Sequence, residues 1–306
     1  MADSLIAGHE LLDPAEASSG HTSLFTDARS RLLRRPTFLA AAGFVLLMVA
    51  IAILPQAFAG WFGHGDPRSC DLANSALASR SGHPFGFDKQ GCDVYANVIY
   101  GARASISIGL LVTALSVVIA LVLGSLSGYY LGIIDTIVSR VSDIFFGFPF
   151  ILGALVLLTS FQSHTVWTVS LALALFSWPT LTRLMRASIL STKELDYVLA
   201  ARSLGATDWR LIRRHLLPNA ISPVIVISAL TVGGVIAAEA TLTFLGVGLQ
   251  QPAISWGLQL ANAQSNFQVH PHLLIYPGLF LSATVLSFIV LGDALQDVLD
   301  PRRNDA

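Results

Sequence analysis

Few side chains in this sequence could carry out chemistry. A phosphate-binding P-loop needs the pattern G-x-x-x-x-G-K-[ST]. The chain has only two lysines, Lys89 and Lys193, and they are preceded by Asp88 and Thr192 rather than glycine. Any step driven by ATP would therefore need another polypeptide to bind the nucleotide.

Other catalytic or metal-binding arrangements are also missing from the sequence. His270 and His272 supply two imidazoles without an evident third ligand, which is weak support for a metal site. Ser127 precedes Gly128 but lacks the glycine spacing of a nucleophile elbow. We predict no catalytic residue, no metal and no cofactor in this chain, and we expect that it is not an enzyme.

Three further residues, Cys70, Cys92 and Glu239, could have structural or binding roles. We predict that Cys70 and Cys92 form a disulfide, because we expect their segment to face an oxidising compartment; the alternatives are two free thiols, or a metal-binding or catalytic role. Glu239 lies in a long apolar segment, where a carboxylate is costly unless it is paired. It could line a transport pathway or make a structural hydrogen bond.

The composition indicates an integral membrane protein. The 306 residues are 54% hydrophobic and 12% charged, with a mean hydropathy of +0.66. Soluble domains average about 25% charged residues. The net charge of −1 predicts no nucleic-acid partner.

A transmembrane helix needs about 20 mostly apolar residues. Six segments meet this expectation: 37–58, 105–130, 144–160, 166–186, 221–246 and 272–294. With both termini inside, fourteen of the eighteen Lys and Arg residues fall in cytoplasmic segments and four in the first outer loop. The positive-inside rule therefore predicts that both termini are cytoplasmic.

The expected fold class is thus an all-α membrane protein with six transmembrane helices. Its predicted segments are a cytoplasmic tail at 1–36, a first transmembrane helix at 37–58, an extracytoplasmic loop at 59–104, a five-helix core at 105–296 and a cytoplasmic tail at 297–306.

The internal segment 191–223 is polar and amphipathic, although apolar spans flank it. Ser191 and Glu194 have the spacing of a capping box, which would begin a helix. Gly205 can end that helix in a left-handed conformation. Thr207 can cap a second helix, which Pro218 is expected to stop. The segment therefore predicts two helices joined at a bend.

The second helix carries Trp209, Ile212 and Leu216 as an apolar stripe that we expect to hold it to the bundle. Its basic residues leave three interpretations open. The bend could dock a partner, the helix could rest on anionic lipid, or the segment could be a solvated connector.

The run Ala200-Ala201-Arg-Ser-Leu-Gly205, with Pro218 thirteen residues after the glycine, resembles the EAA loop. This loop marks the membrane subunits of binding-protein-dependent ATP-binding-cassette (ABC) importers. Leu199 stands where that family has its first glutamate. The resemblance implies a cytoplasmic coupling helix between helices 4 and 5 that contacts an ATPase through Ala200, Ala201, Arg202, Ser203, Leu204, Gly205, Ala206, Thr207 and Pro218.

Other motifs extend the resemblance to the C-type permease subunits of dipeptide and oligopeptide importers. The outer segment His83-Pro-Phe-Gly86-Phe-Asp88-Lys-Gln-Gly91-Cys-Asp93 matches them, although Cys92 replaces the usual arginine. Later matches are Phe244-Leu-Gly246-Val-Gly248, Pro252 with Trp256-Gly257, Gly292-Asp293, and Leu299-Asp300-Pro301-Arg302. The resemblance implies that Gly86, Asp88, Gly91 and Asp93 contact a binding protein or cap the pathway entrance.

The resemblance also implies a bacterial plasma-membrane location and several partners. These are a second permease subunit, two ATPase subunits that bind ATP and Mg, an extracytoplasmic substrate-binding protein and membrane lipid. An alternative is a secondary transporter driven by an ion gradient. Such transporters tend to have internal repeats, and no convincing repeat is present here. Peptides are the expected substrates, with nickel or another small ligand still open.

Overall fold

The computed structural model describes residues 32–63 and 65–299, and its regular elements in these ranges are helices. The predicted all-α class is confirmed. Most of the two predicted tails, and the motif residues after Leu299, lie outside the described residues.

In chain order the elements are α2 (Pro36–Ile53), α3 (Pro55–Ala59), η2 (Leu72–Asn74), α4 (Val94–Ile119), η3 (Ala120–Gly124), α5 (Ser125–Tyr130), α6 (Gly132–Gly147), α7 (Phe150–Thr159), α8 (Val166–Thr192), α9 (Asp196–Ser203), α10 (Asp208–Arg210), η4 (Leu211–Leu216), α11 (Leu217–Ala220), α12 (Ser222–Phe244), α13 (Trp256–Ala263) and α14 (His272–Leu299).

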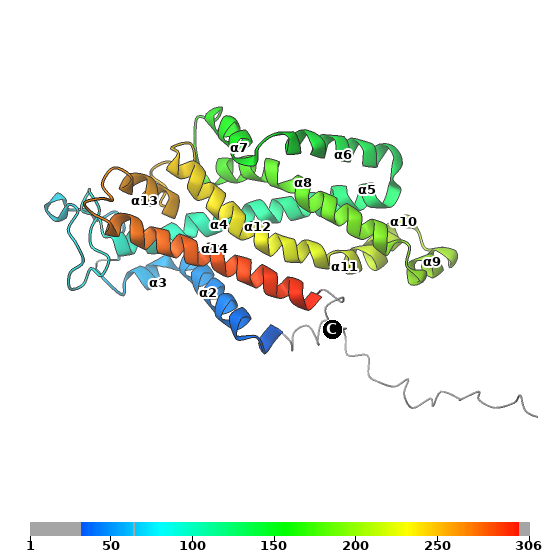
Figure 1. The fold of residues 1–306 in the computed structure, drawn as a ribbon, viewed down its shortest axis with the longest axis horizontal. Coiled ribbons are helices and arrows are strands. Elements are labelled where there is room, and N and C mark those ends of the chain that lie inside the picture. Colours follow the sequence, from blue (N-terminus) through cyan, green and yellow to red (C-terminus); the bar gives the residue numbers. More distant parts are fainter. Residues whose placement is uncertain (1–31, 64, 300–306) are drawn as a thin grey trace, which may run out of the picture.

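Four long helices, α4, α8, α12 and α14, run along the length of the molecule (Figure 1). Helix α4 packs against both α8 and α12, and α14 packs against α12 and α2. Small residues also allow close contact between α8 and the helical segments η3 and α5, which continue α4. A Cβ atom at Gly124 would lie 2.7 Å from Cβ of Met185, and one at Gly128 would lie 2.8 Å from the carbonyl oxygen of Arg186.

Within residues 32–63 and 65–299, four helical stretches are long and apolar enough to cross a membrane: 36–53, 94–130, 222–244 and 272–298. A fifth is possible if α6 and α7 together form one bent span. Helix α8 coincides with the predicted span 166–186 but is too polar to meet the same criterion. Its length suits a membrane helix, while Pro179, Arg183 and Arg186 lower its hydropathy.

Two predicted boundaries differ from the structure. Helix α4 already begins at Val94, because Asp93 caps it by accepting a hydrogen bond from Tyr95 N. The predicted third span, 144–160, is broken at Phe148-Pro149, where α6 and α7 meet at 86°. Phe148 is extended, as a residue before proline prefers, so the helix cannot continue through it.

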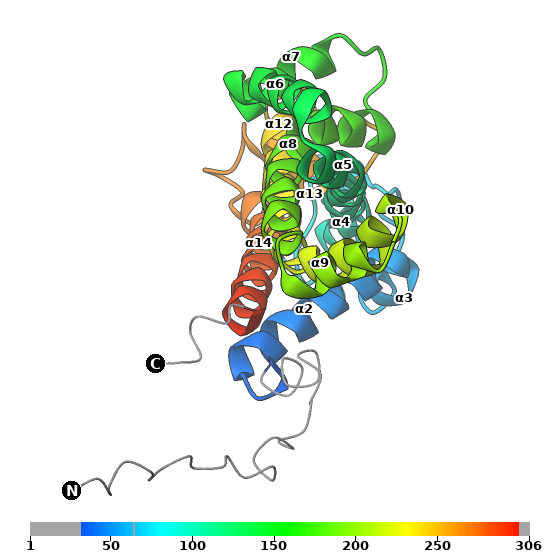
Figure 2. The same cartoon turned by 90° about the vertical axis from the view of Figure 1, so that its right-hand side faces the viewer.

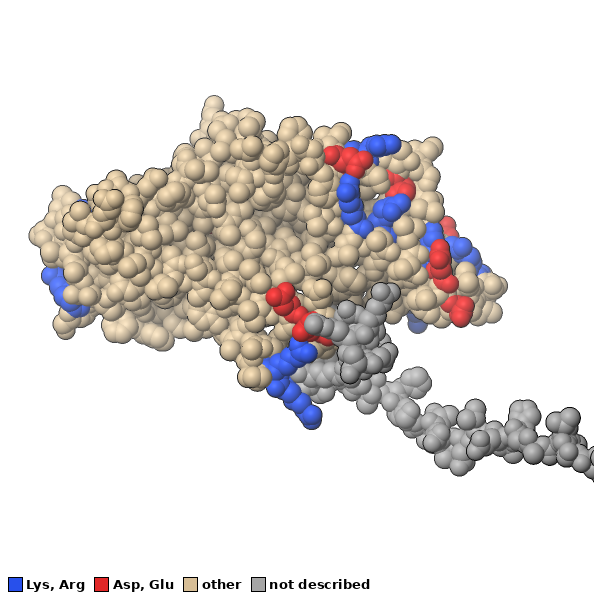
Figure 3. Space-filling view, in the orientation of Figure 1, with Lys and Arg blue, Asp and Glu red and all other residues tan. Residues whose placement is uncertain are grey.

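The two ends of the bundle differ in what they carry. One end holds the segment between α3 and α4 together with α13, and the opposite end holds α9 and α10 (Figure 1). Figure 2 shows α9 in front of the bundle, with α6 and α7 on one side and α2 on the other. Charged side chains gather near α9 and α10 and where α2 begins, whereas much of the remaining face has none (Figure 3).

Candidate coupling site and outer cavity

The bend between α8 and α12 begins with α9, whose last turn is closed by backbone hydrogen bonds. Gly205 N donates to Arg202 O at 3.0 Å, and Ala206 N donates to Ala201 O at 3.1 Å. This is the Schellman pattern, which needs a left-handed residue just after the helix. Gly205 supplies it with a φ of +84°, so the predicted helix end is confirmed.

The predicted start of this helix at Ser191 is wrong. Helix α8 continues through Thr192, and α9 begins only at Asp196. The N-cap residue of α9, Leu195, makes no side-chain cap. The hydroxyl of Ser191 donates instead to Ser188 O at 3.0 Å within α8, because a serine inside a helix can bond to the preceding turn.

Pro218 does not stop the second helix, which is a further correction. The backbone runs from α10 through the π-helical turn η4 into α11, and Pro218 lies in the first turn of α11. Proline has no N–H to donate to Arg214 O. The wider π turn before it accommodates this missing bond, and the chain then continues into α12.

The π turn also changes which side chains face the bundle. Ile212 and Leu216 are buried, as predicted, and Leu211 is buried with them. Trp209 is 65% exposed, so its predicted role in packing is wrong. Trp209 instead borders a shallow groove, which is also lined by Arg210, Arg213, Arg214 and Pro218.

The predicted coupling residues form a mostly exposed surface at the bend, which we call the elbow surface. Leu204 is 89% exposed, and small residues surround it. An exposed apolar side chain within a continuous patch is typical of a contact with another molecule. The exposed members are Ala200, Arg202, Ser203, Leu204, Gly205, Thr207 and Pro218, and the half-buried members are Ala201 and Ala206.

Polar contacts that the sequence did not reveal hold the elbow surface to the bundle. Tyr129 of α5 donates its hydroxyl to Asp208 Oδ1 at 2.6 Å and accepts from Arg202 Nη2 at 3.2 Å. Ser188 Oγ of α8 donates to Ala220 O at 2.8 Å. These contacts connect α5 and α8 to both helices of the elbow. No local pattern marks Tyr129, because it lies within an apolar span.

Ion pairs beside the elbow join α6 to α8. Arg186 donates to both carboxylate oxygens of Asp135, at 2.5 and 2.6 Å. Arg183 pairs with Asp143, which also lies 3.7 Å from Arg140. The closer partners of both carboxylates therefore come from α8 rather than from α6 itself.

At the opposite end, the segment before α4 folds into a compact loop. Cys70 and Cys92 are joined by a disulfide in the structure. Gly91 has a φ of +76° and packs so closely on Asp71 that a side chain would not fit. Asp88 Oδ1 accepts hydrogen bonds from Gln90 N and Cys92 N, both at 2.8 Å.

The other predicted residues of this loop also make internal contacts. Asp93 is 2% exposed, and its Oδ2 lies 2.7 Å from His83 Nδ1. Gly86 is buried against the backbone of Leu77 with a φ of +75°. Asp88 is only half-buried. Burial raises the pKa of its carboxyl group, although the backbone N–H groups around it oppose this shift.

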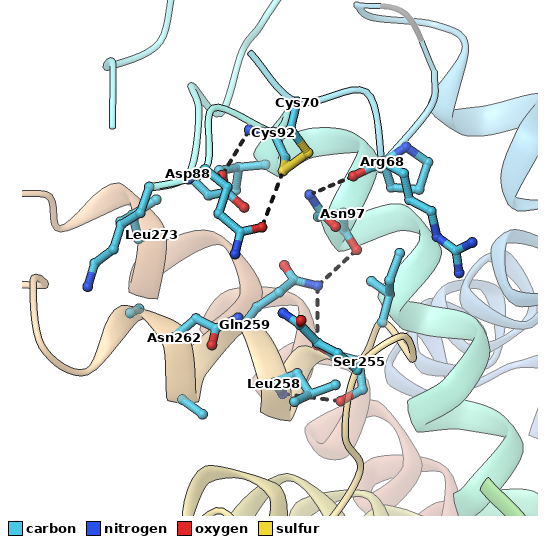
Figure 4. A pocket seen from close by; sticks show the side chains of 18 of the residues that line it. Arg68, Cys70, Asp88, Cys92, Asn97, Ser255, Leu258, Gln259, Asn262 and Leu273 are labelled. Atoms are coloured by element: carbon cyan, nitrogen blue, oxygen red, sulfur yellow. Dashed lines mark hydrogen bonds between the residues drawn. A yellow bond between two sulfur atoms is a disulfide. The ribbon is translucent and has the colours of Figure 1, made fainter. Parts of the chain in front are cut away.

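A cavity of about 630 Å³ lies between this loop and α13 (Figure 4). Asp88, Asn97 and Gln259 line it, and Gln259 Nε2 donates to Asn97 O at 2.8 Å. Arg68 borders it and reaches Pro252 O at 3.3 Å. The outer loop and the segment before α13 are far apart in the sequence, and together they form the walls of this cavity.

Glu239 is fully buried in α12, a helix that packs against α13. It accepts hydrogen bonds from Thr243 Oγ1 at 2.8 Å and Ser105 Oγ at 3.3 Å. The same two hydroxyl oxygens accept from Leu249 N and Trp256 N. Glu239 thus lies at the centre of a network that joins α4 and α12 to the segment leading into α13.

No group of three potential metal ligands lies together in residues 32–63 and 65–299. His272 contacts Phe87 O at 3.2 Å through Nε2, which connects the start of α14 to the outer loop.

Comparison with known proteins identifies the family. The description "binding-protein-dependent transport system inner membrane component" matches residues 120–305, a stretch that includes the elbow surface. The chain belongs to this family. It is accordingly a membrane-embedded permease component of a binding-protein-dependent importer, located in the inner membrane, and not an enzyme.

Curated relatives cover nearly the whole chain. The permease is 37% identical over 277 residues to the glutathione transport system permease protein GsiD of Pectobacterium atrosepticum, with 89% of each chain covered. It is 33% identical over 300 residues to the oligopeptide transport system permease protein OppC of Bacillus subtilis, covering 95% of this chain and 97% of the relative. The resemblance seen in the sequence motifs is confirmed.

Solved structures support the fold. A chain of the inward-facing MetNI methionine ABC transporter covers 67% of this permease and 97% of its own length, with a TM-score of 0.53 and 18% identity. A chain of an amino acid ABC transporter aligns with a TM-score of 0.50 and 20% identity. At these identities the likeness concerns the fold alone.

Proposed function

We propose that this permease forms half of the translocation pathway of an ATP-driven importer for di- or oligopeptides. The observation that carries the proposal is the elbow surface, an exposed bend that is continuous with α12 and tied to α5 and α8. Closure of an ATPase against this surface would move α12, which packs against α13, and α13 lines the outer cavity. The names of the curated relatives support the peptide substrate class.

The proposal includes a specific assembly and orientation. A second permease subunit supplies the other half of the pathway, two ATPase subunits bind ATP and Mg inside, and a substrate-binding protein docks outside. The proposal has six membrane-spanning helices, with α8 and the bent α6–α7 pair each crossing once. An even number of crossings puts both termini and the elbow surface on one side, and the distribution of Lys and Arg favours the cytoplasmic side. The absence of a P-loop sequence in this chain supports separate ATPase subunits.

Reconstituted uptake tests this function directly. We expect proteoliposomes holding the permease, its partner permease and the ATPases to take up radiolabelled trialanine only with ATP and the binding protein present. A non-hydrolysable ATP analogue should prevent uptake, because conformational cycling needs hydrolysis.

The same vesicles separate the proposal from its main alternative. A secondary transporter would take up peptide without the ATPases and would lose uptake when an ionophore dissipates the ion gradient. Uptake by this chain alone that an ionophore abolishes would refute the ATP-driven mechanism.

A further inference from the structure

The cavity between the outer loop and α13 has the features of a ligand site. Its volume of about 630 Å³ falls within the range of about 300–1,000 Å³ that is common for small-molecule pockets. Apolar side chains form part of its lining, and several amide side chains surround them. The apolar members include Leu258 and Leu273, and the amides include Asn97, Gln259 and Asn262.

Opposite charges lie on different parts of the wall. Asp88 lies on the outer loop beside Cys92, and Arg68 lies on the other side of Asn97 (Figure 4). The hydrogen bonds that the Asp88 side chain accepts from Gln90 N and Cys92 N both go to Oδ1. Arg68 uses Nη2 for a single long bond to a carbonyl oxygen. Both groups keep hydrogen-bonding capacity for a charged ligand.

A short peptide combines the properties that this lining selects. Its ammonium group suits Asp88, its carboxylate suits the planar guanidinium of Arg68, and its amide groups suit the surrounding amides. A purely anionic or cationic ligand would leave one of the two charges unmatched. Lys89 also borders the cavity, and its Nζ donates to Ser265 Oγ at 2.6 Å.

We propose that this outer cavity binds short zwitterionic peptides, with the peptide ammonium at Asp88 and the peptide carboxylate at Arg68. This inference rests on the proposed function, because it assigns the peptide a stopping point on the permease itself. The disulfide-linked loop and the network around Glu239 fix the two walls of the site.

Binding measurements on the full-length permease in lipid nanodiscs test this site without any partner. The probes are trialanine, N-acetyl-trialanine and trialanine amide, and isothermal titration calorimetry gives each Kd. We expect acetylation and amidation each to weaken binding at least about tenfold, since each removes one charge-assisted contact. Equal affinity for the three probes, or no binding of trialanine, would overturn the site.

Two variants test which residue binds the ammonium group of the peptide and which binds its carboxylate. Arg68→Gln should weaken trialanine binding about tenfold and should bind the amide as well as the free acid. Asp88→Asn keeps an oxygen acceptor for the loop N–H groups and should no longer distinguish acetylated from free peptide. Arg140→Gln, an exposed arginine on α6, is the matched control and should bind like the wild type.

The outcomes separate this proposal from the proposed function. If Lys89→Gln, rather than Arg68→Gln, binds trialanine amide as tightly as trialanine, the assignment of the peptide carboxylate to Arg68 is wrong. Unchanged binding in both Arg68→Gln and Asp88→Asn would overturn the site while leaving ATP-driven uptake intact. Conversely, if the assembled importer did not take up peptide but the permease showed the expected differences in Kd, the importer proposal would be wrong. The assignment of the cavity would stand.

Discussion

Replacement of Gly205 by valine should reduce both ATPase association and ATP-dependent uptake by at least about tenfold. Gly205 has a φ of +84°, and a β-branched residue in that conformation costs about 1–3 kcal/mol. About 1.4 kcal/mol corresponds to a factor of ten in an equilibrium. The strain falls on the Schellman turn that sets the shape of the elbow surface. Co-purification of the ATPase and uptake in proteoliposomes measure the two effects.

A second glycine provides a matched control for this variant. Gly82 in the outer loop has a φ of +80°, is exposed, and like Gly205 has open space around the position of a Cβ atom. Gly82→Val should therefore bring similar local strain while leaving ATPase co-purification unchanged. Normal ATPase association and uptake in Gly205→Val would show that the bend is not the coupling site.

Replacement of Glu239 by leucine should lower the Tm of the detergent-solubilised permease by about 5 °C or more. The change leaves the buried hydroxyls of Ser105 and Thr243 without their acceptor, and each unsatisfied group costs about 1–3 kcal/mol. Glu239→Gln retains one carbonyl acceptor, so we expect a smaller decrease. Tryptophan fluorescence during heating reports the transition, because Trp256 is held by the same network.

An exposed glutamate on the loop before α9 serves as the control for this series. Glu194→Leu and Glu194→Gln should leave the Tm unchanged, since Glu194 is exposed. If Glu239→Leu had the wild-type Tm but lost peptide uptake, Glu239 would act in the pathway rather than in holding α13. If the role of Glu239 is structural, Glu239→Leu should lower the Tm, and any loss of peptide uptake should follow from that lower stability.

The sequence alone predicted the features that depend on local chemistry. Long apolar runs gave the helical bundle, and Gly205 marked the end of α9 because few other residues adopt a left-handed conformation. These properties follow from one residue and its immediate neighbours.

Features that depend on tertiary contacts could not be predicted in this way. Nothing near Tyr129 indicates that its hydroxyl meets Asp208, since 79 positions separate them. The π turn before Pro218 shifts the buried face by one residue, which moved Trp209 outward and Leu211 inward. The outer cavity needs two segments that are distant in sequence, so neither segment alone showed it.

The most direct test of the account is a cross-link between the elbow surface and the ATPase. The chain has two cysteines, and both are in the disulfide, so an introduced cysteine gives a single free thiol. Leu204→Cys places it on the elbow surface, and Leu72→Cys places a comparably exposed thiol at the opposite end. With a thiol-to-amine cross-linker on the assembled importer, we predict an ATPase adduct from Leu204→Cys and none from Leu72→Cys. An adduct from Leu72→Cys, or none from Leu204→Cys in an assembly that still hydrolyses ATP, would contradict the account.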